Sequence, residues 1–237
     1  MPSQIYKITL AMLEDELYFQ NNIVTNMKNN YYWTKLWDEN LYIQLAKKGF
    51  ISTSYDTKDS LLLLPELQYD YAILDFDKLH ISKKVKKLIE KNDATLNFNT
   101  KFDEVLKNLQ KQHKYNWLKD DYAQLMKKLF KNKYENFKLI SVELLSNEQE
   151  LIAGEIGYII GTTYTSLSGF SSKSKIHNNY GKLQLTLLAK YLQNKGFSFW
   201  NLGHPHMTYK QKLGALTYTR EDFLKRWQKA TKQTILL

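Results

Sequence analysis

The chain has no cysteine among its 237 residues. Disulfides, a thiol nucleophile and a thiolate metal site are therefore excluded. Only nine glycines and three prolines are present, so no flexible linker is expected to divide the chain into independent domains. The longest apolar run, Leu61 to Pro65, is far too short to cross a bilayer, and the first residues lack the pattern of a signal peptide. We expect a soluble protein of the cytoplasm.

Histidine offers little for a metal site. Of the five histidines, only His204 and His206 lie close together in the sequence, and no carboxylates accompany them at metal-binding spacing. We therefore expect no metal.

Positive charge is abundant and unevenly distributed. The formal net charge is +10, and residues 83–131 alone contain thirteen lysines against six acidic residues. Such a cluster favours a polyanionic partner, because binding releases condensed counterions. The alternative is a solvated helix face. The candidate phosphate contacts are the four lysines of one short expected helix: Lys83, Lys84, Lys86 and Lys87.

Hydrophobic periodicity predicts both strands and helices from about residue 71 onward. Strands are expected over 71–74, 95–98, 139–145, 151–160, 162–170 and 197–202, and helices over 82–89, 102–109, 119–130, 183–192 and 220–227. The order strand, helix, strand over 162–202 indicates a βαβ unit. Its two parallel strands can splay apart and open a cleft.

The first 64 residues show no strong strand pattern. Asp38 is expected to cap a short helix that ends at Gly49. We expect residues 1–64 to form a small N-terminal subdomain packed on a main domain of residues 65–237. The fold class expected for the whole is α+β, with a mixed sheet and flanking helices.

Seven parts of the chain resemble, in order and spacing, the motifs of one enzyme family, the leucyl/phenylalanyl-tRNA–protein transferases. The match at Leu79 to Lys87 is very close, since LHISKKVKK stands where the family has LHISRSMKR. The other matching segments are 37–41 with 47–50, 116–118, 140–144, 151–158, 181–185, and 213–215 followed by 220–224. The resemblance implies a GNAT-like acyltransferase fold. It also implies transfer of an amino acid from a charged tRNA to a protein N-terminus, without a cofactor.

The resemblance implies a pocket for the terminal adenosine of the tRNA and its aminoacyl group. Trp117 matches a family residue beside this pocket, and an indole offers a flat face for base stacking. A core position for Trp117 is the alternative. Tyr71 is a weaker candidate, since the family's aromatic motif is not kept around it.

A five-residue segment matches the part of the family that holds the donor amino acid: Leu167, Ser168, Gly169, Phe170 and Ser171. Leu167 stands where the family has a glutamate for the α-amino group. Gly169 stands where the family has a methionine that lines the side-chain pocket. These two changes remove a carboxylate and enlarge the pocket, so a donor other than leucine or phenylalanine, such as arginine, becomes possible.

The family's catalytic Asp and Gln are also replaced. Asn201 and Gly203 occupy their places, and Asn cannot accept a proton as Asp can. His204 and His206 follow directly, and either can act as a base near neutral pH. The alternative for both histidines is a polar loop.

Three functions remain open from the sequence. The first is an aminoacyl-tRNA–protein transferase that tags an acceptor protein for degradation. The second is a non-catalytic protein that binds charged tRNA or N-degron peptides, which the lost carboxylates favour. The third is an acetyl-CoA-dependent N-acetyltransferase, which is disfavoured because Asn178 to Leu183 lacks the second small residue of a pyrophosphate loop.

Overall fold

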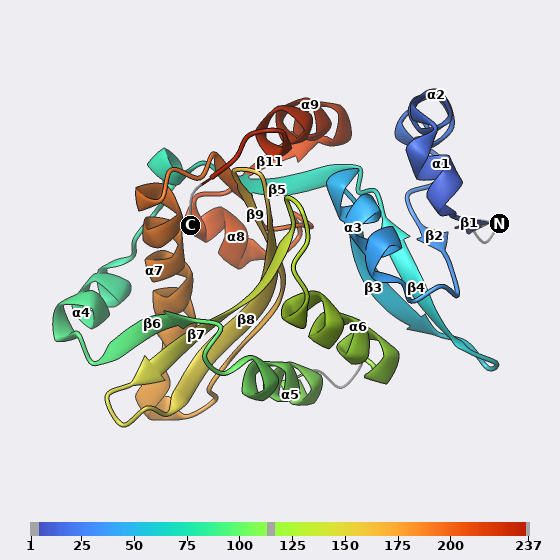
Figure 1. Ribbon diagram of the computed structural model, residues 1–237. Coiled ribbons are helices and arrows are strands. Elements are labelled where there is room, and N and C mark those ends of the chain that lie inside the picture. The colour runs from blue at the N-terminus through green and yellow to red at the C-terminus, as the bar shows by residue number, and fades with distance from the viewer. Residues whose placement is uncertain (1–4, 113–116, 236–237) are drawn as a thin grey trace.

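The computed structural model describes residues 5–112 and 117–235, and its centre is a mixed β-sheet (Figure 1). Among these residues, seven strands pair in the order β11-β5-β10-β9-β8-β7-β6. Their bounds are β5 Asp70–Leu74, β6 Ala94–Phe98, β7 Lys138–Ser146, β8 Leu151–Ile160, β9 Thr163–Ser171, β10 Phe199–Asn201 and β11 Leu216–Thr219. The β9–β10 pair is parallel and the other pairs are antiparallel. The expected α+β class is confirmed.

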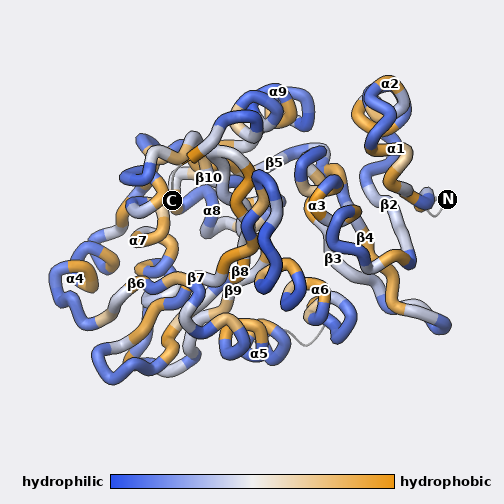
Figure 2. Tube along the Cα trace, in the orientation of Figure 1, coloured by the Kyte–Doolittle hydropathy of each residue, from blue (hydrophilic) through white to orange (hydrophobic). Residues whose placement is uncertain are grey.

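Helices cover both faces of this sheet. On one face, here called the α5 face, lie α5 (Phe102–Gln112) and α6 (Asp120–Lys131), with α9 (Arg220–Thr231) at one end. On the other, here called the α7 face, lie α4 (Lys83–Lys91) and α7 (Tyr180–Asn194), and the short α8 (Thr208–Leu213) lies beside α7. Figure 2 shows that α4 is largely hydrophilic while the central strands are largely hydrophobic.

The predicted βαβ unit is present. Helix α7 connects β9 to the parallel strand β10, and it ends just before Gly196, whose φ of 81° is in the left-handed region that glycine tolerates. The pairing of the two strands is short, because it joins only 199–201 of β10 to 163–165 of β9. Beyond Thr165, β9 pairs with β8 alone within the part of the chain that the structure describes. The second half of β9 is therefore splayed away from β10.

A β-bulge marks the start of this splay. The partner of β8 changes from Ser168, opposite Ile156, to Ser166, opposite Gly157, so Leu167 is the extra residue of β9. A bulge bends the strand that carries it and increases its local twist. The bulge lies just beyond the last β9–β10 pair, Thr165 with Asn201.

The N-terminal part contains a hairpin that the sequence did not predict. Strands β3 (Ile51–Asp56) and β4 (Leu61–Glu66) pair with each other outside the large sheet. They follow α3 (Glu39–Lys47), whose cap is the predicted one: the Asp38 carboxylate accepts a hydrogen bond of 2.9 Å from the Leu41 amide. Before α3 come β1 (Tyr6–Lys7), α1 (Leu10–Glu14), α2 (Glu16–Tyr18), a π-helical turn (Phe19–Val24) and β2 (Tyr32–Trp33).

No helix in the described ranges combines the length and the apolar composition that a membrane span needs.

Candidate functional site

The predicted donor segment lies on the splayed half of β9. All five of its residues are at least partly accessible, and Gly169 is exposed. Leu167 and Phe170 pack against the core of the α5 face. Gly169 and Ser171 point toward the α7 face, because a side chain at Gly169 would meet Glu155 and a side chain at Gly181 of α7 would meet Ser171. The open half of β9 thus presents side chains to both faces of the sheet.

Trp117 lies on the α5 face, beside β3. Its carbonyl accepts a hydrogen bond from the Ser54 hydroxyl, and its ring meets Tyr122 edge-on with centroids 4.7 Å apart. The indole is only partly buried. It therefore has an accessible surface for a base, although part of the ring packs against the core as in the alternative interpretation.

Tyr71 is not available to a substrate, and this prediction was wrong. The residue is fully buried, and its ring is stacked on Phe223 at 3.7 Å between centroids. Its hydroxyl donates to the Gly49 carbonyl at 3.0 Å and accepts from the Gln68 amide at 2.9 Å. The inward face of β5 and the packing of α9 make Tyr71 a core residue.

Asn201 has a structural contact at the end of β10. It is 1% exposed, and its side-chain oxygen accepts a hydrogen bond of 2.9 Å from the Gly203 amide. Gly203 has φ 73°. The Asn201 side chain therefore shapes the turn that leads from β10 into the following loop.

The loop after β10 carries a histidine paired with a carboxylate. His204 Nε2 lies 2.8 Å from the Glu66 Oε2 atom at the end of β4, and the second Glu66 oxygen accepts from the Asn30 amide at 2.6 Å. The Glu66 side chain is 7% exposed, whereas that of His204 is 40% exposed. A buried carboxylate that holds an accessible imidazole is the arrangement of an oriented general base.

His206 lies next to this pair without a carboxylate partner among the described residues. Its ring stacks on that of His204, with centroids 5.5 Å apart and planes at 23°. His206 is exposed. Of the two predicted bases, the structure favours His204.

The buried ammonium group of Lys210 holds the same loop in place. This lysine is 4% exposed, and its ammonium donates to the carbonyls of Leu202 at 2.5 Å and His204 at 2.6 Å. Burial lowers the pKa of Lys210 to about 8. The loop that positions His204 is thus held by two charge-assisted hydrogen bonds.

Strand β3 brings the histidine loop and Trp117 to one region of the α5 face. A side chain at Gly203 would lie 3.2 Å from Ile51 at the start of β3, and Ser54 of the same strand bonds to Trp117. Three residues of strand span about 10 Å. Gln68 is also next to Gly203, and its buried Oε1 has no hydrogen-bond partner among the residues that the structure describes.

The four predicted RNA-contacting lysines lie on the opposite face. All four are exposed on α4, and none of them forms an ion pair within the described part of the chain. Helix α4 packs on α7 through Val85 and Leu183. The sheet therefore separates these lysines from Trp117 and Phe170.

A buried glutamate that was not among the predicted site residues lies beside the point where β9 and β10 separate. Glu155 on β8 is 3% exposed, and its carboxylate accepts from the hydroxyls of Tyr164 and Ser166, each at 2.7 Å, and from the Gln184 amide at 3.3 Å. Trp200 of β10 donates to Ser166 at 2.8 Å. Burial raises the pKa of Glu155 to about 7. The network ties β8, β9, β10 and α7 together where β9 and β10 separate.

Glu155 and Glu66 were not predicted as site residues, and they differ in whether the sequence contains a signal that could have identified them. Glu155 interrupts an apolar strand, LIAGEIGYII, and a charge in such a run is a sequence-level mark of a special site. Glu66 lies 138 positions from His204. Only the fold brings these two together.

Known proteins resemble this chain in sequence over about two thirds of its length. The family model for leucyl/phenylalanyl-tRNA protein transferase matches residues 73–228. A protein of that name from Maridesulfovibrio salexigens is 28% identical over 156 residues, which cover 64% of this chain and 61% of the relative. One from Flavobacterium psychrophilum is 29% identical over 160 residues, or 65% of this chain and 70% of the relative. The chain thus aligns with less than two thirds of the Maridesulfovibrio salexigens relative.

Among solved structures, the resemblance is more remote. FemX gives a TM-score of 0.47 at 11% identity, covering 81% of this chain and 70% of that one. L-PGS from Bacillus licheniformis gives 0.43 at 12% identity, covering 85% and 72%.

Proposed function

Since the chain belongs to the leucyl/phenylalanyl-tRNA protein transferase family, we propose that it transfers an aminoacyl group from charged tRNA to the N-terminal amine of an acceptor protein. The observation that carries this proposal is the His204–Glu66 pair in the loop directly after β10, the strand that pairs with β9 as far as Thr165. An accessible imidazole oriented by a buried carboxylate supplies the proton acceptor that Asn201 cannot.

The reaction needs one proton acceptor and one carbonyl. The acceptor nitrogen attacks the carbonyl carbon of the aminoacyl ester, and a C–N bond forms. His204 takes a proton from that nitrogen and returns it to the ribose oxygen as the C–O bond breaks. The products are an amide and a free 3′-hydroxyl, so the histidine ends in its starting state. Positioning of the two substrates contributes much of the rate, since aligned groups gain up to about 7–11 kcal/mol over free ones.

In this proposal, the two faces of the sheet contact different parts of the tRNA. The lysines of α4 contact phosphates on the α7 face. The acylated end passes between β9 and β10, where β9 has an open edge, and reaches Trp117 and His204 on the α5 face. An open strand edge also offers unpaired backbone donors and acceptors to a ligand.

The donor amino acid differs from the family's usual ones in this proposal. Gly169 leaves space that a longer side chain can fill, and Glu155 lies beside it without a cationic partner in the described ranges. A buried carboxylate that only neutral donors hold is stabilised further by a cation. We include a basic donor such as arginine for this reason. The acceptor would be tagged for N-end-rule degradation in the cytoplasm, where charged tRNA is available.

A transfer assay tests the proposal. Purified protein is given a tRNA pool charged with labelled amino acids, together with peptides that differ at the N-terminal residue. The expected result is label on at least one peptide N-terminus, which is lost with His204→Ala. Binding of charged tRNA without any labelled peptide, for every amino acid including arginine, would support the non-catalytic binding protein instead.

A further inference from the structure

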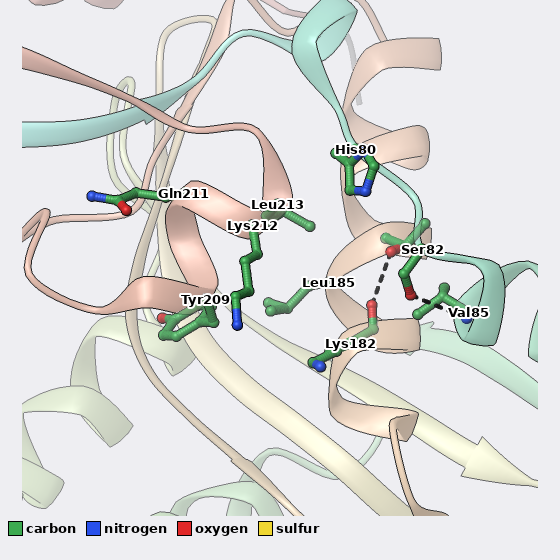
Figure 3. A pocket seen from close by; sticks show the side chains of 10 residues that line it. His80, Ser82, Val85, Lys182, Leu185, Tyr209, Gln211, Lys212 and Leu213 are labelled. Atoms are coloured by element: carbon green, nitrogen blue, oxygen red, sulfur yellow. Dashed lines mark hydrogen bonds between the residues drawn. The ribbon is translucent and has the colours of Figure 1, made fainter.

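A cavity of about 420 Å³ lies where α4, α7 and α8 meet on the α7 face (Figure 3). This volume is within the range of about 300–1,000 Å³ that is typical of small-ligand sites. Its walls include the apolar side chains of Val85, Leu185 and Leu213 and the ring of Tyr209. The cavity is separate from the His204 site, whose residues do not line it.

The charged groups of the cavity are all basic. Lys182 of α7 and Lys212 of α8 line it together with His80, and no acidic residue is among the lining residues. Neither lysine forms an ion pair within the part of the chain that the structure describes. Figure 3 shows their side chains reaching toward the same side of the cavity, with Leu185 between them. Two unpaired ammonium groups on an apolar wall favour an anionic ligand with an apolar part.

The walls of the cavity are fixed before any ligand binds. The His80 amide donates to the Leu213 carbonyl at 2.8 Å. Gly214 has φ 108°, and a side chain there would overlap the Lys78 carbonyl oxygen, so α8 lies directly against residues 78–80. Ser82 caps α4 through the Val85 amide at 3.4 Å. A preformed site loses little free energy to ordering on binding.

We propose that this cavity binds a phosphate-bearing nucleotide, with the phosphate between Lys182 and Lys212 and the base against Leu185 and Tyr209. An aromatic ring offers a flat face on which a base can stack. The further assignment of this nucleotide to the acceptor strand of the donor tRNA rests on the proposed function. It is supported by position, because Val85 of the lysine-rich α4 lines the same cavity.

Tyr209 also connects the cavity to Glu155, which lies where β9 and β10 separate. Burial, and then the charge of Glu155, raise the pKa of the Tyr209 hydroxyl to about 12. The residue lines the cavity and is 40% exposed overall. A nucleotide in the cavity would lie close to β9, because Lys182 follows Gly181, where a side chain would meet Ser171.

Calorimetry with AMP and adenosine tests the site without any transfer reaction. AMP is expected to bind at least tenfold more tightly than adenosine, because only AMP has the phosphate. The double variant Lys182→Ala, Lys212→Ala is expected to lose at least tenfold in AMP affinity. A double variant that removes the same charge from the exposed end of the chain, Lys229→Ala with Lys232→Ala, is the matched control and should bind AMP as the unmodified protein does.

An uncharged acceptor-stem RNA then separates the possible sources of the nucleotide. If the nucleotide belongs to RNA, the Lys182, Lys212 variant reduces the salt slope of RNA binding by about 1.4–1.8. Loss of AMP binding with an unchanged RNA slope would keep the nucleotide site but overturn its assignment to tRNA. Equal binding of AMP and adenosine, or AMP binding unchanged in the variant, would overturn the site itself. None of these outcomes depends on whether the protein transfers an amino acid.

Discussion

Two buried carboxylates near the splay differ in what surrounds them. Glu66 meets an imidazole that reaches solvent, while Glu155 meets two hydroxyls and an amide deep in the sheet. The first arrangement can move a proton to and from a substrate, since one partner is both basic and accessible. The second has no positively charged partner among the described residues, so its ionised form is costly in this buried position. The two residues therefore lead to different predictions.

His204 is predicted to set the chemical rate. We expect His204→Ala to lower kcat of the transfer reaction by roughly 100-fold or more, within the 10²–10⁴-fold range of general bases, with little change in KM for charged tRNA. His206→Ala should cause a much smaller loss, because no carboxylate of the described residues orients that ring. Steady-state kinetics of both variants check this, and equal losses in the two would show that His204 has no special role.

Glu155 is predicted to make stability depend on pH. Its pKa is about 7 in the folded protein, against an ordinary value of 4.5 for a glutamate in the unfolded chain, so the folded state binds more protons between these values. Stability from this group is complete below pH 4.5 and is lost as the pH rises to 7, by about 3 kcal/mol in total. Urea unfolding at several pH values measures it. In Glu155→Gln this part of the pH dependence should disappear, and an unchanged difference between pH 5 and pH 7 would contradict the account.

At the scale of elements, periodicity predicted most of the sheet and the long helices correctly. The amphipathic spacing of α5, α6 and α7 and the apolar strands β7, β8 and β9 are local signals. The hairpin β3–β4 was missed for a physical reason. Residues 51–56 contain serine and threonine where a buried strand usually has larger apolar side chains, and 61–64 is continuously leucine, so neither segment alternates. Helix α8 was not predicted, since six residues carry too little periodicity.

The candidate site was only partly predictable, because some of its residues come from elements that are far apart in the sequence. The donor segment on β9 and the lysines of α4 could be located from short motifs, because each is continuous in sequence. The Glu66–His204 pair and the cavity of Lys182 and Lys212 could not, since each joins separate elements through the fold. Tyr71 was wrongly predicted to bind substrate, because a tyrosine in a strand has the same sequence signal whether its ring faces a ligand or α9.

Helix α4 is predicted to bind RNA as a unit. Changing Lys83 and Lys86 to Ala should lower the salt slope of tRNA binding by about 1.4–1.8, since each neutralised phosphate contributes about 0.7–0.9. Lys131→Ala with Lys133→Ala removes the same charge at the end of α6 on the other face and is the control. Filter binding over a salt series provides the slopes. A slope that is unchanged in the α4 variant would leave this helix as a solvated surface.

The junction between α8 and residues 78–80 is predicted to depend on Gly214. An added methyl group would overlap the Lys78 carbonyl oxygen and would also force a non-glycine residue to φ 108°, so Gly214→Ala should destabilise the protein by well over ~2 kcal/mol. Gly196 has a positive φ of 81°, but a Cβ added there would meet no atom of the described residues within 4 Å. Gly196→Ala should therefore cost only about 1 kcal/mol. Comparable losses for both in urea unfolding would show that the close approach of α8 is not as described.

At the scale of the whole molecule, the sheet separates two groups of candidate residues. The four predicted RNA-contacting lysines of α4 and the two lysines of the adjoining cavity lie on the α7 face, while Trp117, Gln68 and His204 lie on the α5 face. The β9–β10 pairing ends at Thr165, just before the bulge at Leu167, and the proposed path of the acylated end between the two faces lies there. A charged tRNA fits this division, because its stem is a polyanion and its acylated end is a single strand.

Photocrosslinking from two positions of one tRNA tests this division most directly. A photoreactive adenosine at the 3′ end should crosslink to residues of β3, to 117–118 or to the loop 202–206, and a photoreactive base in the acceptor stem should crosslink to α4 or α7. Mass spectrometry of the crosslinked peptides identifies them. Crosslinks from both positions to the same face of the sheet would contradict the proposal that the acylated end passes between β9 and β10.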